Sequence, residues 1–323
     1  MIARLPRLVT SLLVALPLAL GAARGWACPA CVEGDDGGRA DLAGTSRTWS
    51  AQLSVEAWRD RLRGGDGQAL EVVRATPSLA WRTPWLDRSV VLSAALPLSL
   101  RRQRSLEPDL ELARTSAPGD LDTSATWSPA QPGVTQSASA TLGVRWPTAP
   151  EVESNGAPVS DDVQPGSGAF TLLAGAGVQS TTGTWTLSGS WIFAADARLF
   201  VPVVALRAER PGGAAALDLR AERRIGDSLG LEAGAWTRGD LAAADDDGPI
   251  DDTGGVVTGA LAGASWHAAS GLSVGLRTRV PVASIATGNH ERGPALALWL
   301  RWAGAAGADD EGPVDLGPAG LWR

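Results

Sequence analysis

The chain has 323 residues and a formal net charge of −7, and hydrophobic residues make up 44% of it. An acidic chain lacks the basic footprint of a nucleic-acid-binding protein, so we predict no nucleic-acid partner. After the N-terminus no apolar run is long enough for a membrane-spanning helix, which excludes a helical membrane protein.

Residues 1–27 are typical of a cleaved secretory signal peptide. Arg4 and Arg7 precede the apolar run LVTSLLVALPLALGAA, and Gly25 and Ala27 place small residues three positions and one position before the expected cleavage point. We therefore predict that the mature chain begins at Cys28 and leaves the cytosol.

The mature chain opens with CPAC, and we expect residues 28–46 to form a periplasmic N-terminal segment. Cys28 and Cys31 are the only cysteines. They fit a disulfide formed on export, two inert thiols, or a redox couple or half of a metal site. Lipidation of Cys28 is a further interpretation, although Gly25 occupies the position where a lipoprotein signal usually has leucine. No histidine follows Cys31, so c-type haem attachment is excluded and we predict no cofactor.

Beyond this segment the sequence keeps returning to one pattern, in which apolar and polar residues alternate. In VTQSASATLGVRW (134–146), Leu142 belongs to the apolar set and Thr141 to the polar set. Successive side chains of an extended strand point to opposite faces, so each such segment has one apolar and one polar face. The segments predicted as strands are 48–58, 69–82, 89–101, 119–128, 134–146, 167–179, 184–193, 213–224, 228–238, 255–267, 271–282 and 293–302.

The connections between these strands alternate in length. Short turns lie at 83–87, 128–133, 180–183, 225–228 and 267–271, and longer polar loops lie at 102–118, 148–166, 239–254 and 284–292. Outer-membrane barrels have short periplasmic turns and longer extracellular loops, and their tilted strands have about 9–11 residues. We predict an all-β fold, an antiparallel transmembrane β-barrel of about 12 strands over residues 47–303, in the outer membrane of a Gram-negative bacterium. Leu142 would face lipid and Thr141 the lumen.

Two segments stand apart from this pattern. Residues 199–208 are apolar on both faces and contain Pro202, so we interpret them as an extension or inward-folded part of a connection. A barrel of 14 strands is the alternative, because single-chain bacterial barrels have even strand numbers. Residues 304–323 are predicted to form an acidic Pro/Gly-rich tail.

The polar faces of the predicted strands carry charged side chains. We expect the following to line the lumen: Arg145, Arg220, Glu222, Arg224, Glu232, Arg238, Arg277 and Arg279. The arginines could attract anions, as rings of basic side chains do in anion pores. Paired with glutamates across a narrow lumen, they could equally fill it with salt bridges.

An acidic loop precedes residue 255. Its carboxylates are Asp245, Asp246, Asp247, Asp251 and Asp252. Such a cluster can bind cations at a pore mouth, although its spacing does not match a calcium-binding EF-hand loop; a solvated loop is the alternative. The only histidines, His267 and His290, have no nearby serine or aspartate in a recognisable catalytic pattern, so we predict no enzyme and no catalytic residue.

Three stretches resemble a broad family of outer-membrane β-barrel transporters related to the meta-pathway phenol-degradation proteins. They are GDLDTSATW (119–127), GVRWPTAP followed by QPGSGAFTLLAGAGV (143–178), and RVPVASIATGNHERGPALALWLRW (279–302). The likeness covers roughly residues 45–303. This chain departs from the family in having Pro147-Thr148-Ala149 where the third residue is commonly glycine, and it extends past the usual final strand. The resemblance implies an outer-membrane barrel with a transport role and carries over no site residue.

These observations together predict a channel or transporter for small solutes, in contact with outer-membrane lipid. The loops 102–118, 148–166 and 239–254 would form its constriction. The alternative is a closed structural or interaction barrel whose N-terminal CxxC docks a periplasmic redox or metal-handling partner.

Overall fold

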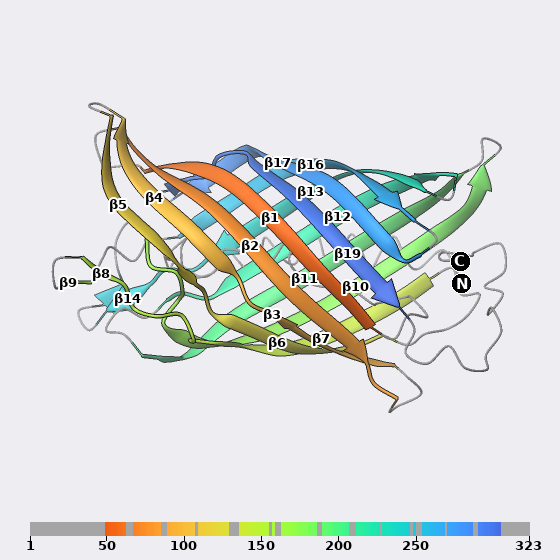
Figure 1. Cartoon of the computed structure of the whole chain (residues 1–323), viewed down its shortest axis with the longest axis horizontal. Coiled ribbons are helices and arrows are strands. Elements are labelled where there is room, and N and C mark those ends of the chain that lie inside the picture. The colour runs from red at the N-terminus through yellow and green to blue at the C-terminus, as the bar shows by residue number, and fades with distance from the viewer. Residues whose placement is uncertain are drawn as a thin grey trace.

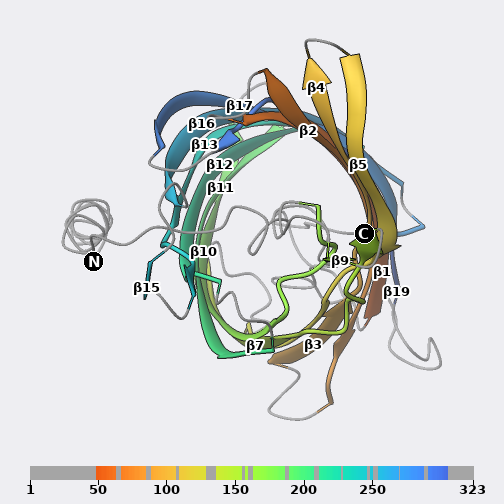
Figure 2. The same ribbon diagram turned by 90° about the vertical axis from the view of Figure 1, so that its left-hand side faces the viewer.

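The computed structural model contains one large antiparallel sheet that closes on itself (Figures 1 and 2). It describes residues 49–304 apart from 63–66, 85–88, 107–108, 129–135, 155–156, 159–162, 186–188, 207–210, 227, 246–247, 250–253, 269 and 287–289. The strands of the wall are β1 (Trp49–Leu62), β2 (Gln68–Arg82), β3 (Val90–Ala95), β4 (Leu98–Leu106), β5 (Asp109–Pro118), β6 (Leu121–Trp127), β7 (Gln136–Trp146), β10 (Ala169–Trp185), β11 (Gly189–Ala205), β12 (Ala214–Ile225), β13 (Leu229–Asp240), β16 (Gly255–His267), β17 (Leu272–Ala286) and β19 (Ala295–Gly304). Short ladders add β8 (Glu153–Ser154), β9 (Ala157–Pro158), β14 (Ala244–Asp245), β15 (Gly248–Pro249) and β18 (His290–Glu291).

The ring closes because β1 pairs with β2 on one side and with β19 on the other. One half of β2 pairs with β4 and the other half with β3, so β3 and β4 occupy a single place in the wall on either side of Pro97. β5 and β6 share a place in the same way, on either side of Gly119. The predicted barrel of twelve strands is therefore confirmed.

The prediction of a loop over 102–118 is wrong. These residues form most of the β4–β5 hairpin, which rises beyond the rest of the wall at the end opposite the start of β1 and the end of β19 (Figure 1). The alternating pattern fails here because charged side chains occupy the outer face, where the other strands carry apolar ones. Consequently this stretch belongs to the wall and is not a constriction loop.

The interpretation of 184–193 and 199–208 is also wrong. β10 ends at Trp185 and β11 begins at Gly189, so the predicted strand over 184–193 is divided between two strands, and residues 199–205 lie in β11. The ladder shifts register between Phe170 and Thr171, which accommodates Pro202 in the wall. Both faces are apolar here because Phe200 points inward, where it is buried against Leu173 and Ala214.

Burial alternates along the strands as expected for a wall between lipid and a polar interior. Large apolar side chains are exposed on the outer face, including Leu142 at 70%, Leu79 at 64% and Val282 at 73%. The opposite face carries buried Ser, Thr, Arg and Asp side chains. Among the described residues, no helix is long and apolar enough to cross a membrane.

Tryptophans lie over glycines on neighbouring strands. Trp299 is the register partner of Gly275, and a Cβ added at Gly275 would lie 2.2 Å from Cε2 of the indole. Trp236 and Gly259 make a second such pair. The absence of a side chain on the glycine gives each ring room to lie flat against the sheet.

We therefore expect Gly275→Val to lower the free energy of unfolding by about 1–3 kcal/mol, the usual cost of overpacking. Ala264→Val, on the exposed outer face of the adjacent strand β16, is the matched control and should change the stability little. Urea unfolding followed by tryptophan fluorescence measures both variants. Equal stability of the two would contradict the packing argument.

Candidate functional site

The inner face of the wall carries arginines bonded to carboxylates, some on the same or the neighbouring strand and others across one or two intervening strands. Arg145 on β7 donates from Nε and Nη2 to the two oxygens of Asp122 on β6, at 2.8 and 2.9 Å. Arg277 Nη2 on β17 donates to Glu232 Oε2 on β13 at 2.9 Å, and β16 lies between these two strands. Bidentate arginine–carboxylate pairs of this kind fix both side chains in position.

The residues predicted to line the lumen lie on this inner face, and the structure brings each of them into an ion pair. Two pairs form within the predicted set, Glu222–Arg224 and Glu232–Arg277. The remaining pairs use acidic partners that were not singled out: Arg145–Asp122, Arg220–Asp196, Arg238–Asp240 and Arg279–Asp218. Their identity depends on strand register, which the alternating pattern alone does not supply.

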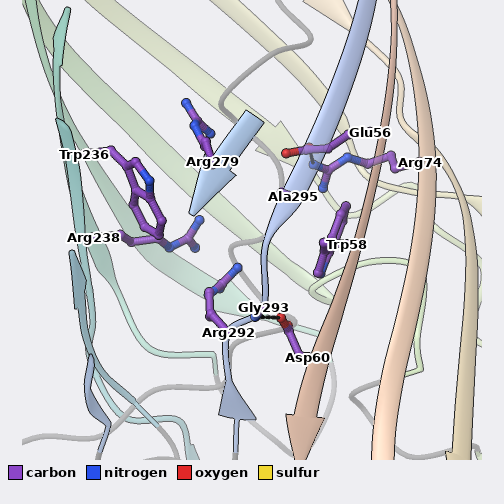
Figure 3. Close-up of a pocket in the computed structure, with 10 residues that line it drawn as sticks. All are labelled: Glu56, Trp58, Asp60, Arg74, Trp236, Arg238, Arg279, Arg292, Gly293 and Ala295. Atoms are coloured by element: carbon purple, nitrogen blue, oxygen red, sulfur yellow. Dashed lines mark hydrogen bonds and ion pairs between the residues drawn. The ribbon is translucent and has the colours of Figure 1, made fainter. Parts of the chain in front are cut away.

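A pocket opens on the inner face between β1, β2, β13, β17 and the segment before β19 (Figure 3). It encloses about 510 Å³ of empty space, open solvent included. Its lining consists of Glu56, Trp58, Asp60, Arg74, Trp236, Arg238, Arg279, Arg292, Gly293 and Ala295. Trp236 and Arg238 face Trp58 and Arg74 across this space.

The side chains on the β1 and β2 side of the pocket hold one another in place. The Arg74 guanidinium lies 4.8 Å from the centre of the Trp58 ring and donates to Glu56. Asp60 Oδ1 accepts a hydrogen bond of 3.0 Å from the Gly293 backbone N–H. The pocket therefore offers fixed guanidinium groups beside two indole rings, a surface suited to anions and to flat apolar groups.

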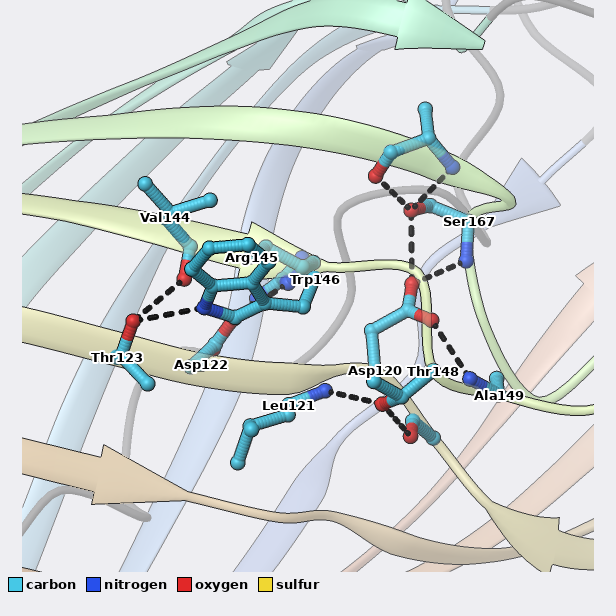
Figure 4. A network of polar contacts seen from close by, with 12 residues as sticks. Asp120, Leu121, Asp122, Thr123, Val144, Arg145, Trp146, Thr148, Ala149 and Ser167 are labelled. Atoms are coloured by element: carbon cyan, nitrogen blue, oxygen red, sulfur yellow. Dashed lines mark hydrogen bonds and ion pairs between the residues drawn. The ribbon is translucent and has the colours of Figure 1, made fainter. Parts of the chain in front are cut away.

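A second polar site lies at the break between β5 and β6, where Asp120 anchors the 147–168 segment (Figure 4). Asp120 Oδ2 accepts from the Ser167 backbone N–H at 2.7 Å and from Ser167 Oγ at 2.8 Å. Asp120 Oδ1 accepts from the Ala149 backbone N–H at 3.2 Å. Thr148 Oγ1 accepts from the Leu121 N–H at 2.9 Å. One buried carboxylate thus binds both ends of the segment to the wall.

The lack of a side chain on Gly166 lets the 147–168 segment pack closely against Asp120. A Cβ at this position would lie 2.3 Å from the Ala149 Cβ and 2.4 Å from Asp120 Oδ1. The short motifs GDL (119–121), PTA (147–149) and PGSG (165–168) therefore meet at one point in space. The sequence contained this signal as three separate motifs, but it did not indicate that they form one site.

The anchored segment extends over the barrel opening. Its β8–β9 ladder lies at the end of the barrel opposite the start of β1 and the end of β19 in Figure 1, and within the ring in the end-on view of Figure 2. Gln164 stabilises the segment by bonding the backbone N–H and C=O of Val152, at 3.0 and 2.9 Å. By contrast, the β14–β15 ladder of the 239–254 loop lies beside the opening (Figure 2).

The other predicted sites are only partly described. Asp245 pairs with Gly248 in the β14–β15 ladder, whereas Asp246, Asp247, Asp251 and Asp252 lie outside the described residues. Cys28, Cys31, the signal peptide and the acidic tail also lie outside them. In the described part of the chain, no three His, Cys, Asp or Glu side chains gather where they could hold a metal ion.

The two histidines lie at opposite ends of the wall. His267 bonds Ser265 Oγ through Nε2 and Ser273 Oγ through Nδ1, both at 2.9 Å. A hydroxyl stands where a catalytic triad would have a carboxylate on Nδ1. His290 lies in β18, opposite Leu62 at the other end of the barrel.

Comparison with known proteins shows which solved structures share this fold. A scan against protein-family models and a search of curated proteins each found no match. Among solved structures, the chain is similar to the COG4313 outer membrane channel from Pseudomonas putida F1, with a TM-score of 0.61 and 14% sequence identity, over 84% of this chain and 99% of that one. It is also similar to the transport unit of the autotransporter AIDA-I from Escherichia coli, with a TM-score of 0.50 and 10% identity, over 83% and 93% of the two chains. The fold is thus that of outer-membrane β-barrels.

Proposed function

We propose that this protein is an outer-membrane channel for small solutes, with a preference for anions. The observation that carries the proposal is a closed barrel whose exposed outer face is apolar and whose inner face holds fixed arginines around an open pocket. An apolar exterior suits lipid, and a polar interior suits a path for solutes.

The preference for anions follows from the balance of charge on the inner face, where the described arginines outnumber the carboxylates. The arginines are Arg74, Arg82, Arg101, Arg145, Arg198, Arg220, Arg224, Arg238, Arg277, Arg279, Arg292 and Arg301. The carboxylates are Glu56, Asp60, Asp120, Asp122, Asp196, Asp218, Glu222, Glu232 and Asp240. An excess of fixed positive charge in a narrow polar path raises the local concentration of anions.

Single-channel conductance of the refolded mature protein in a planar bilayer tests the proposal. We expect reproducible current steps, and a reversal potential in a salt gradient that has the sign of an anion current. Silence from protein that is demonstrably folded, judged by its heat-modifiable mobility on a gel, would overturn the channel assignment.

A pair of variants tests the source of the preference. Arg279→Gln removes a pocket charge and should shift the reversal potential toward that of a non-selective pore. Arg59→Gln removes an arginine whose side chain is about half exposed on the outer face of β1 and should leave the reversal potential unchanged. Equal shifts in the two variants would show that the inner face does not set the selectivity.

A further inference from the structure

The outer faces of β1, β2, β4 and β5 change abruptly from apolar to charged along the strand register. The last row without a charge, read across the four strands, is Ala57–Val73–Leu100–Ser116. The next row on the same face is Arg59–Glu71–Arg102–Arg114, and the row beyond it is Arg61–Ala69–Arg104–Glu111. The change from apolar to charged side chains therefore falls between the same two register rows on all four strands, and it ends the apolar part of the outer face there.

The two charged rows are rich in arginine. Glu71 lies between Arg59 and Arg104, at 3.7 and 3.9 Å, and Glu111 pairs with Arg102. Arg61 and Arg114 are exposed and make no ion pair with any residue that the structure describes. Glu291, the register partner of Arg61, adds a third carboxylate on this face, and among the side chains that the structure describes there the arginines exceed the glutamates.

The position of these rows in the barrel identifies what they would meet. They lie at the end opposite the paired residues Trp49 and Gly304, which are the first residue of β1 and the last residue of β19. In an outer-membrane barrel this is the extracellular end, since both termini lie in the periplasm. The rows then lie on the extracellular side of the apolar surface, the side on which the head groups of the outer leaflet carry a phosphorylated glycolipid in a Gram-negative outer membrane.

We propose that the arginine rows on β1, β2, β4 and β5 bind the phosphate groups of the outer-leaflet glycolipid, lipid A. The guanidinium group presents a planar set of donors that matches phosphate oxygens, and arginine stems pack along apolar surface while their heads stay polar. The apolar rows directly below would contact the acyl chains of the same molecule. The proposal depends on the outer-membrane location proposed above but not on the passage of solutes.

Native mass spectrometry of the folded full mature chain in detergent, with lipid A titrated in, tests the proposal. Arg61→Gln combined with Arg114→Gln removes the two arginines that make no ion pair with a described residue, and we expect lipid A affinity to fall about tenfold or more. Arg223→Gln is the matched control. Arg223 lies on the outer face near the other end of the barrel, as the register partner of the exposed Leu231. This control should bind lipid A as the wild-type protein does.

The wild-type protein provides a test that needs no variant. Dephosphorylated lipid A should bind about tenfold or more weakly than diphosphorylated lipid A, and millimolar inorganic phosphate should not displace the lipid. Equal binding of the two lipids, displacement by free phosphate, or wild-type affinity in the Arg61/Arg114 variant would each overturn the assignment. All these readouts are independent of conductance, so a protein that binds lipid A but conducts no ions would contradict only the channel proposal.

Discussion

Replacing Asp122 by alanine is expected to lower the free energy of unfolding by about 3–5 kcal/mol, the cost of leaving one member of a buried ion pair without its partner. Only 7% of the Arg145 side chain and 9% of the Asp122 side chain are exposed. The Arg145 guanidinium also lies 5.8 Å from the centre of the Phe200 ring, so apolar surface covers it on that side. Urea unfolding in detergent, followed by tryptophan fluorescence, measures the loss.

Glu111→Ala provides the control for this prediction. Glu111 bonds Arg102, and both side chains are 39% exposed, so water solvates either charge once the other is removed. An exposed pair contributes about 0–1 kcal/mol, and the variant should therefore unfold almost as the wild-type protein does. If Asp122→Ala costs no more than Glu111→Ala, burial is not what makes the Arg145–Asp122 pair important.

Replacing Asp120 by alanine is expected to free the 147–168 segment from the wall and to raise the single-channel conductance. The variant loses three hydrogen bonds to a buried carboxylate, each of which contributes about 1.5–3 kcal/mol. We also expect faster cleavage of the segment by added protease in the folded protein, because cleavage requires local opening.

Ser167→Ala gives a graded control for the same anchor. It removes the hydroxyl contact at 2.8 Å and leaves the backbone N–H contact of Ser167 and that of Ala149 in place. Its conductance and cleavage rate should lie between those of the wild-type protein and of Asp120→Ala. Conductance in Asp120→Ala equal to that of the wild type would show that the segment does not restrict the opening.

Most of the wall could be predicted from the sequence because lipid and the polar interior impose opposite requirements on alternate residues. Segment 255–267 was predicted with the bounds of β16, and 213–224 is within one residue of β12. The pattern failed where these requirements change. Around Arg102 the outer face leaves the apolar band, and around Phe200 the inner face is apolar.

The candidate site was less predictable than the wall. The alternation of apolar and polar residues is enough to place an arginine such as Arg145 on the inner face. It does not show that Asp122 is its partner, because strand pairing depends on turn lengths and on the break at Gly119. Asp120 and Ser167 lie 47 positions apart in the chain, and only the folded wall brings them together.

The anchor at Asp120 also separates the 147–168 segment into a fixed base and a tip whose described strands take no part in the wall. The bonds from Ala149 and Ser167 hold the base, whereas β8 and β9 pair only with each other. Because lengthening a surface loop costs little closure entropy, the chain between Ser154 and Ala157 is the natural point at which to insert a foreign peptide. The barrel is in this respect a scaffold that can carry an inserted peptide at one of its openings.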